Sequence, residues 1–420
     1  AFSSYTYDAA GNRTSMTDLS GAHSYGYDDL HRLTSATHPG ASFVPTKNET
    51  FGYDPVGNRQ ADANITNYQY DAANRLLENS SFTYTYDADG NQTGKTDKAT
   101  LEQTVYGFDS ESQLKQVDLP DGTVFAAKYD GLGRRIEKST GTAVSRTARY
   151  VYDNEDIVAM LDGDNAMTAV FSHGPGIDEP LMMRKADGAE FFMHQDGLGS
   201  IIAHSDNLGF EEERICYGAY GMPILLDVRG PVVSRDDSFT ESPYAFTSRE
   251  RDRILLLYYH GARYRDFTTG GFLSPEPNGL TKFDVAPYLY ALNNPARWAD
   301  PDGAAPAAPN LAPSLPLSGN PPPPDIFTPS AGPLPPNIFH PQPGTGLICL
   351  SKGPESDNWA ARAARKKAQA GAGGGDPCRV LDEMDRDANM LGDKKQRNST
   401  KAAIKFAKKL LGCRHHGERY

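Results

Sequence analysis

The stretch YTYDAAGNR (residues 5–13) decides the fold, because variants of it return along the first third of the chain. The step from an aromatic residue to aspartate recurs at intervals of 16 to 26 residues, which is short enough for one hairpin each. The aromatic residues alternate with a small one, so Tyr5 and Tyr7 are predicted to project from the same face of a strand. The related stretches are YGYDDLHRL, FGYDPVGNR, YQYDAANRL, YTYDADGNQ, YGFDSESQL, AKYDGLGRR and YVYDNEDIV.

Each aspartate is predicted to begin a turn, in which Gly11 and Asn12 tolerate the positive φ that a chain reversal needs. Stacked hairpins set tyrosines beside tyrosines on neighbouring strands, and each hairpin needs its neighbours to bury its face. The prediction is a mostly β protein built on one long, coiling antiparallel sheet. The stretch Asp87–Asn91 is similar to a calcium loop but lacks the distal glutamate, so a plain hairpin turn is expected there.

The composition supports this fold class and divides the chain. Tyr (22), Gly (40) and Pro (30) are plentiful, which favours strands and turns. The net charge of −12 separates into −18 for residues 1–304, −1 for 305–345 and +7 for 346–420. Apolar runs fall short of the ~18–20 residues that span a bilayer. The four cysteines lack zinc-ligand spacing, so we expect no metal or cofactor. The chain opens inside a predicted strand, so we expect a piece of a longer shell.

The repeat resembles the YD repeat of the Rhs family of bacterial polymorphic toxins, which the C components of insecticidal Tc complexes and teneurins share. Five stretches of sequence further along the chain are similar to the Rhs-associated core. They are SHGPGIDEPL (172–181), HQDGLGSI (194–201), PYAFTSRERD (243–252), LYYHGARYRDFTTGGFLSPEPNGL (257–280) and YLYALNNPARWADPDG (288–303). The resemblance implies a hollow β shell around the polypeptide that follows it. The predicted divisions are YD repeats at 1–160, the core at 161–304, a proline-rich linker at 305–345 and a basic helical effector domain at 346–420.

Carboxylates gather near the end of the core. Two close carboxyls that share one proton can hydrolyse a peptide, because one activates water and the other supports the carbonyl oxygen. The candidates are Asp266, Glu276, Asp284, Asp300 and Asp302.

The resemblance narrows these candidates to an aspartyl-type self-cleaving pair, Glu276 and Asp300, with Asp266 as a supporting acid. The bond implied is Ala304–Ala305. Glu276 stands where the family usually has aspartate, and Ala304 stands where it usually has leucine. The alternative is that DPDG (300–303) is only a turn, with proline and glycine at suitable positions.

The last 75 residues are predicted to form a helical hairpin from DPCRVLDEMDRDANML (376–391) and TKAAIKFAKKLLGC (400–413). Cys378 begins the first helix and Cys413 ends the second, so a disulfide between them is allowed. The basic charge fits a nuclease or nucleic-acid binder, in which His415 and His416 serve as base or metal ligands. The lysine-rich amphipathic helix equally fits a membrane-active toxin. The sequence leaves the target open.

The resemblance implies the C-terminal part of a polymorphic toxin that encapsulates its tail as cargo and releases it by self-cleavage for competition between bacteria. It implies a cognate immunity protein and export from the cytoplasm by a specialised system, such as type VI secretion, into a target cell. Two alternatives stay open: a non-enzymatic surface or adhesion protein with an inert tail, and a core that no longer cleaves. We expect His194, His260, Cys216 and Trp298 to be packing or turn residues.

Overall fold

The computed structural model describes residues 3–18, 21–39, 48–142, 145–176, 179–227, 240–277 and 286–304. The predicted linker at 305–345 and helical domain at 346–420, with Cys378 and Cys413, lie outside these residues, as do Ala305 and Asp284. The described part is mostly antiparallel β-sheet, as predicted, with two 3-10 turns, η1 (Phe246–Ser248) and η2 (Ala291–Asn293). Among these residues, no helix is long and apolar enough to cross a membrane.

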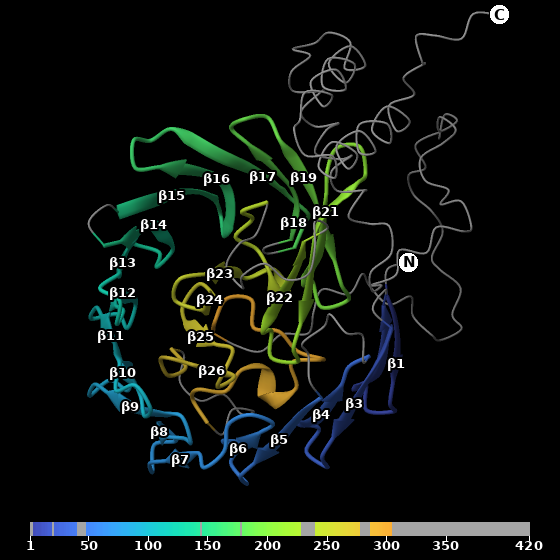
Figure 1. Ribbon diagram of the computed structural model, residues 1–420, viewed down its shortest axis with the longest axis vertical. Coiled ribbons are helices and arrows are strands. Elements are labelled where there is room, and N and C mark those ends of the chain that lie inside the picture. The colour runs from blue at the N-terminus through green and yellow to red at the C-terminus, as the bar shows by residue number, and fades with distance from the viewer. Residues whose placement is uncertain are drawn as a thin grey trace, which may run out of the picture.

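Strands β1 to β22, here called the wall, are hairpins paired in chain order. The wall curves from β1 past β7 and β15 to β21 and surrounds a smaller sheet (Figure 1). Its first sheet contains β1 (Ser4–Tyr7), β2 (Arg13–Asp18), β3 (Gly21–Tyr27), β4 (Leu33–Thr37), β5 (Glu49–Tyr53) and β6 (Arg59–Asp62).

The second sheet of the wall has sixteen strands. They are β7 (Gln69–Tyr70), β8 (Leu76–Glu78), β9 (Phe82–Tyr86), β10 (Gln92–Asp97), β11 (Gln103–Phe108), β12 (Leu114–Asp118), β13 (Val124–Tyr129), β14 (Arg135–Gly141), β15 (Ser145–Asp153), β16 (Asp156–Asp162), β17 (Met167–His173), β18 (Pro180–Lys185), β19 (Glu190–Gln195), β20 (Ile201–Ser205), β21 (Glu211–Tyr217) and β22 (Pro223–Asp227). The hairpin series therefore continues beyond residue 160, where the sequence predicted a boundary; that boundary stays a prediction.

The aspartate of each repeat closes a turn. Oδ1 of Asp8 accepts hydrogen bonds from the backbone N–H of Ala10 (3.0 Å) and of Asn12 (2.8 Å). Gly11 has a φ of 82°, as predicted, but Asn12 does not adopt a positive φ, so that part of the prediction was wrong. Asn12 is instead buried, and its side chain donates to Oδ2 of Asp8 (2.8 Å).

Oδ1 of the aspartate accepts from the N–H four residues later at Asp28, Asp54, Asp71, Asp87, Asp109 and Asp130 as well. The plain hairpin turn predicted at Asp87–Asn91 is thus confirmed. At Asp153 the turn is tighter, and Asp153 pairs directly with Asp156.

The tyrosine before the aspartate joins its hairpin to the preceding one. The Tyr27 hydroxyl donates to the carbonyl of Arg13 (2.8 Å), and the Tyr129 hydroxyl donates to the carbonyl of Leu114 (2.7 Å). Tyr53, Tyr70, Tyr86 and Tyr152 repeat this bond. The sequence predicted tyrosine rings side by side on neighbouring strands. In the hairpin repeats, ring contacts between tyrosines instead run along one strand, as between Tyr5 and Tyr7 (6.4 Å), and hairpins are linked through hydroxyls; a cross-strand tyrosine pair is found outside the repeats, at Tyr259 and Tyr264 (5.1 Å).

Side-chain hydrogen bonds also join neighbouring turns in pairs: the first turn to the second, the third to the fourth and the fifth to the sixth. The amide of the asparagine that follows glycine in one turn bonds to a polar side chain in the next turn, over 2.8 to 3.1 Å. That polar residue replaces glycine and has a φ of 59 to 62°. Such a conformation costs free energy for a non-glycine residue, and the side-chain bond offsets part of it. The pairs are Asn12 with His31, Asn58 with Asn74, and Asn91 with Ser112.

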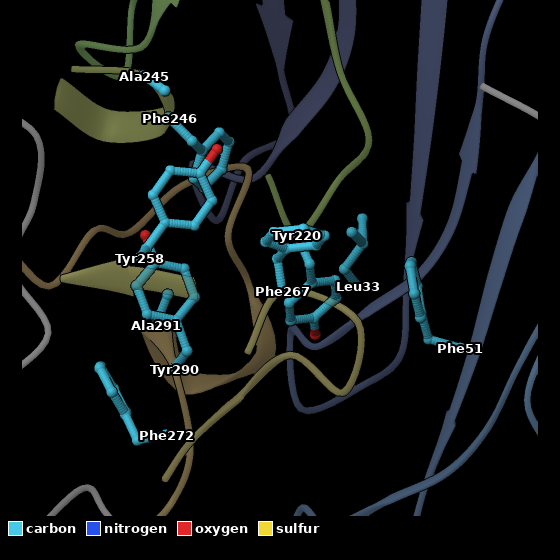
Figure 2. Close-up of a cluster of buried hydrophobic side chains, with 10 residues drawn as sticks. All are labelled: Leu33, Phe51, Tyr220, Ala245, Phe246, Tyr258, Phe267, Phe272, Tyr290 and Ala291. Carbon is cyan, nitrogen blue, oxygen red and sulfur yellow. The ribbon is translucent and has the colours of Figure 1, made fainter. Parts of the chain in front are cut away.

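The inner segment, residues 240–277 and 286–304, lies within the curve of the wall (Figure 1). It carries a four-stranded sheet of β23 (Glu250–Asp252), β24 (Leu257–Tyr259), β25 (Tyr264–Asp266) and β26 (Gly271–Phe272). Figure 2 shows a buried cluster in which Leu33 and Phe51 of the wall share one core with Tyr258 and Tyr290 of the inner segment. The inner segment therefore completes the core that the hairpins cannot form by themselves.

A buried ionic cluster fastens the inner segment to the wall. Arg135 of β14 is fully buried and pairs with Glu250 of β23, which also accepts from Lys138 (2.8 Å) and from the Tyr150 hydroxyl (2.8 Å). Burial raises the pKa of Glu250, but the charges of Arg135 and Lys138 more than offset this and lower it to about 2. The ends of the wall also meet, because Tyr5 accepts from the N–H of Gly197 (2.7 Å) and Glu49 accepts from that of Ala219 (2.7 Å).

The hydrogen bonds of the turn predict that alanine substitutions of two adjacent aspartates lower the free energy of unfolding by different amounts. Asp28 accepts from the N–H of Leu30 and of Arg32 and from Nε of Arg32. The substitution Asp28→Ala removes all three bonds, so it should lower the free energy of unfolding by about 2 kcal/mol in urea titrations. Asp29→Ala removes the same charge at a position that the first turn fills with Ala9. That control should stay within about 0.5 kcal/mol of the parent, and equal losses would contradict the role of Asp28.

The ionic cluster predicts a specific acid sensitivity. The folded pKa of Glu250 lies below its ordinary value of 4.5, so its stabilising contribution is complete above pH 4.5 and is lost as the pH falls towards 2. Glu250→Gln should flatten the fall in unfolding free energy over that range. At pH 7 it should destabilise the chain by about 3–5 kcal/mol, because Arg135 loses its partner. Glu111→Gln, at an exposed turn, is the matched control; unchanged pH slopes in both variants would count against the cluster.

Candidate functional site

The structure brings two of the predicted acids together on one arginine. Nη2 of Arg263 lies 2.8 Å from Oε2 of Glu276 and 3.0 Å from Oδ2 of Asp300. Arg263 directly precedes β25, Glu276 follows β26, and Asp300 follows η2. The side chains of all three are at most 4% exposed. The guanidinium also lies 3.6 Å above the ring of Phe272, which fixes its plane.

The charges of this trio do not balance if both acids are ionised. The charge of Arg263 favours the ionised form of both acids, whereas burial favours the protonated form. Burial raises the pKa of Asp300 above its usual range, Arg263 offsets part of that shift, and the neighbouring Asp302 carboxylate adds to it. The arrangement can therefore hold one proton on Asp300 beside a second, ionisable acid.

The DPDG turn is seated on the hairpin turn between β24 and β25. Gly303 has a φ of 72° and Gly261 has a φ of 73°. A Cβ atom on Gly303 would come within 3.0 Å of the backbone nitrogen of Arg263 and closer still to the carbonyl of His260. Only glycine fits both the conformation and the contact. The turn predicted at 300–303 thus exists, and it holds Asp300 against Arg263.

Ala304, on the amino-terminal side of the predicted bond, borders a cavity of about 810 Å³. The lining includes Glu276 and Asp302 from the inner segment and the turn at 131–134 from the wall. The N–H of Ala304 donates to Oδ1 of Asp302 (3.0 Å). Glu276, rather than Asp300, is thus the acid of the pair that faces this space.

Asp266 occupies a different place. Its carboxylate binds Lys95 of the wall (2.9 Å) and the N–H of Thr268 (2.7 Å). Burial raises its pKa, but Lys95 and the bonds from Thr268 outweigh this and lower it. Side chains alternate along a strand, so Asp266 lies on the face opposite to Arg265 and away from Arg263. The structure joins it to the wall and not to the pair; its supporting role stays a prediction.

Two residues of this site were not predicted from the sequence. Arg263 was not singled out, although arginine before a strand near several acids signals a buried ion pair. His260 was assigned to packing; it is fully buried, and its Nδ1 lies 2.6 Å from the carbonyl oxygen of Asp300. Trp298 does pack against the buried cluster, and His194 bonds to Ser205 (2.8 Å). In the described ranges no three His, Cys, Asp or Glu side chains converge as a metal site.

The close packing of the DPDG turn against the neighbouring hairpin is tested by comparing alanine substitutions of two glycines. Gly303→Ala combines a positive φ with contact against the backbone of the neighbouring hairpin, whereas Gly122→Ala has a φ of 82° and open space around it. Both substitutions should cost about 1 kcal/mol for the backbone conformation. Gly303→Ala should cost about 1–3 kcal/mol more because of the overpacking. Urea unfolding of both variants measures this, and equal losses would mean that the turn is not seated as described.

Comparison with known proteins shows which family the chain belongs to. The teneurin YD-shell profile matches residues 3–227. The tRNA nuclease WapA of Bacillus subtilis is 30% identical over 308 residues, which cover 71% of this chain and 11% of WapA. The probable deoxyribonuclease RhsA of Dickeya dadantii is 27% identical over 334 residues, covering 73% of this chain and 21% of RhsA. This chain therefore spans only a minor part of each relative.

A crystal structure of TcdB2-TccC3 is also similar, at 20% identity and a TM-score of 0.39, over 71% of this chain and 20% of that one. Weaker sequence similarity extends to Teneurin-3 of Danio rerio, which is 24% identical over 267 residues, 58% of this chain and 9% of Teneurin-3. The match of the YD-shell profile to residues 3–227, more than half of the chain, shows that the chain belongs to the teneurin YD-shell family; it is a YD-repeat shell protein related in sequence to Rhs toxins, WapA and the C components of Tc toxins.

Proposed function

We propose that this chain cuts its own backbone between Ala304 and Ala305 and thereby separates the tail, residues 305–420, from a YD-repeat shell. The observation that carries the proposal is the bridge from Arg263 to both Glu276 and Asp300, next to Ala304. Two acids held close together in a buried site share a proton more readily than two solvated acids do. This is the protonation state that hydrolysis by paired carboxylates requires.

The roles follow from the surroundings of each acid. Glu276 borders the cavity, so it can take a proton from a water molecule there while the oxygen of that water attacks the carbonyl carbon of Ala304. Asp300, whose pKa is raised, donates its proton to the carbonyl oxygen. When the tetrahedral intermediate collapses, the C–N bond breaks and the nitrogen of Ala305 receives the proton held by Glu276, while one hydroxyl of the intermediate returns its proton to Asp300 as the carbonyl double bond re-forms; the new carboxylic acid at Ala304 then ionises. The products are a carboxylate at Ala304 and an amine at Ala305, and one water is consumed.

The tail is proposed to be a toxic effector, held by the shell until it is cut and delivered by a secretion system, with a cognate immunity protein in the producing cell. The support is the family, in which WapA of Bacillus subtilis is named a tRNA nuclease and RhsA of Dickeya dadantii a probable deoxyribonuclease. The net charge of +7 on residues 346–420 favours a polyanionic target, either nucleic acid or an anionic membrane. The similarity to Teneurin-3 keeps an adhesion role without cleavage as the second candidate.

Cleavage is tested by the intact mass of the purified chain under denaturing conditions. We expect two pieces that divide after Ala304. Asp300→Asn cannot donate the proton and Glu276→Gln cannot accept one, so each should slow cutting at least ~100-fold. Asp89→Asn, which removes an exposed carboxylate from a wall turn, should cut like the parent. A chain that stays whole, or cutting that persists in both acid variants, would reject the proposed pair.

A further inference from the structure

We infer that Arg249 and His260 are positioning residues that select the bond to be cut, because with Ala262 and Arg263 they bind every carbonyl of the DPDG turn. We call the four donors the carbonyl clamp: Nη1 of Arg249, Nδ1 of His260, the N–H of Ala262 and Nε of Arg263. The inference rests on the proposed function, and it deepens it by naming what sets the position of the cut.

The clamp has one donor for each of four successive carbonyls. His260 binds that of Asp300 (2.6 Å) and Arg249 that of Pro301 (2.5 Å). Ala262 binds the carbonyl of Asp302 (3.0 Å) and Arg263 that of Gly303 (2.5 Å). The donor side chains are buried, since Arg249 is 4% exposed, His260 is 0% and Arg263 is 2%. Such bonds are worth most where water is excluded.

His260 is held in the one form that can donate. Its Nδ1 faces a carbonyl and must carry the proton, and its Nε2 accepts from Nε of Arg265 (3.1 Å). The ring is therefore the neutral Nδ1–H tautomer. Burial, with the charge of Arg265 next, lowers the pKa of His260 well below its ordinary 6.5, so the ring stays neutral at physiological pH.

The clamp fixes a segment that ordinary strand pairing cannot hold. Pro301 has no N–H and therefore cannot pair within a ladder. The donors come instead from side chains beside β23 and from the turn after β24. The clamp ends at Gly303, so Ala304 is the first residue past it and borders the cavity that Glu276 also lines. Holding the reacting bond at a fixed place against the acids can be worth about a hundredfold in rate per ångström.

The experiment follows cleavage of the full chain by intact mass over time, in three variants of His260. His260→Ala removes the donor and should slow the cut after Ala304 at least ~10-fold. His260→Asn places an amide N–H close to the position of Nδ1, so it should cut after Ala304 within about threefold of the parent. His260→Gln carries its amide one methylene further out and should behave like His260→Ala. Arg249→Met should likewise slow the cut or spread it over neighbouring bonds.

If His260 had only a structural role, His260→Asn and His260→Gln variants of equal thermal stability would be cut at equal rates. Cutting of His260→Ala at the parent rate would overturn the inference, and so would equal rates in all three variants. If the parent itself stays whole, the proposed function fails, and amide hydrogen exchange then decides about the clamp. The clamp predicts that the Ala262 amide exchanges faster in His260→Ala than in the parent, while amides of β14 are unchanged. Equal exchange at Ala262 would disprove it.

Discussion

One buried guanidinium holds the centre of this molecule together. Arg263 contacts Glu276, which follows β26, and both Asp300 and the carbonyl of Gly303 in the DPDG turn. Arg263 brings two buried carboxyls together, and burial with the neighbouring Asp302 carboxylate raises the pKa of Asp300, so Asp300 holds a proton more readily than a solvated aspartate does. The same contact that organises the last turn of the core thus also sets up the chemistry proposed for it.

This arrangement depends on the wall. A hairpin with an aromatic face is not stable alone, and the hairpins here gain their core from each other and from the inner segment. Tyrosine hydroxyls join successive hairpins, and Arg135 and Lys138 fasten β23 through Glu250. Because the sheet of β23 to β26 is fixed to the wall in this way, the side chains of Arg249, His260 and Arg263 are held in fixed positions around the DPDG turn.

Local features of the fold were predictable from the sequence, whereas features set by distant partners were not. The turn aspartates and Gly11 act within five residues of the chain, so their roles follow from residue type and order. The positive φ predicted for Asn12 was wrong because its side-chain amide instead forms hydrogen bonds with Asp8 and His31. The tyrosine hydroxyl bonds escaped prediction because each acceptor is a backbone carbonyl of another hairpin, which no residue identity marks.

The sequence supplied five candidate acids and the resemblance narrowed them to a pair, whereas the geometry adds what neither contained: the clamp, and a different place for Asp266. The central claim is that water attacks the carbonyl of Ala304, and cutting in ¹⁸O-labelled water tests it directly. The account predicts one ¹⁸O atom in the new carboxylate of piece 1–304 and none in piece 305–420. Label in neither piece, or a break at the Asp300–Pro301 bond, would contradict it.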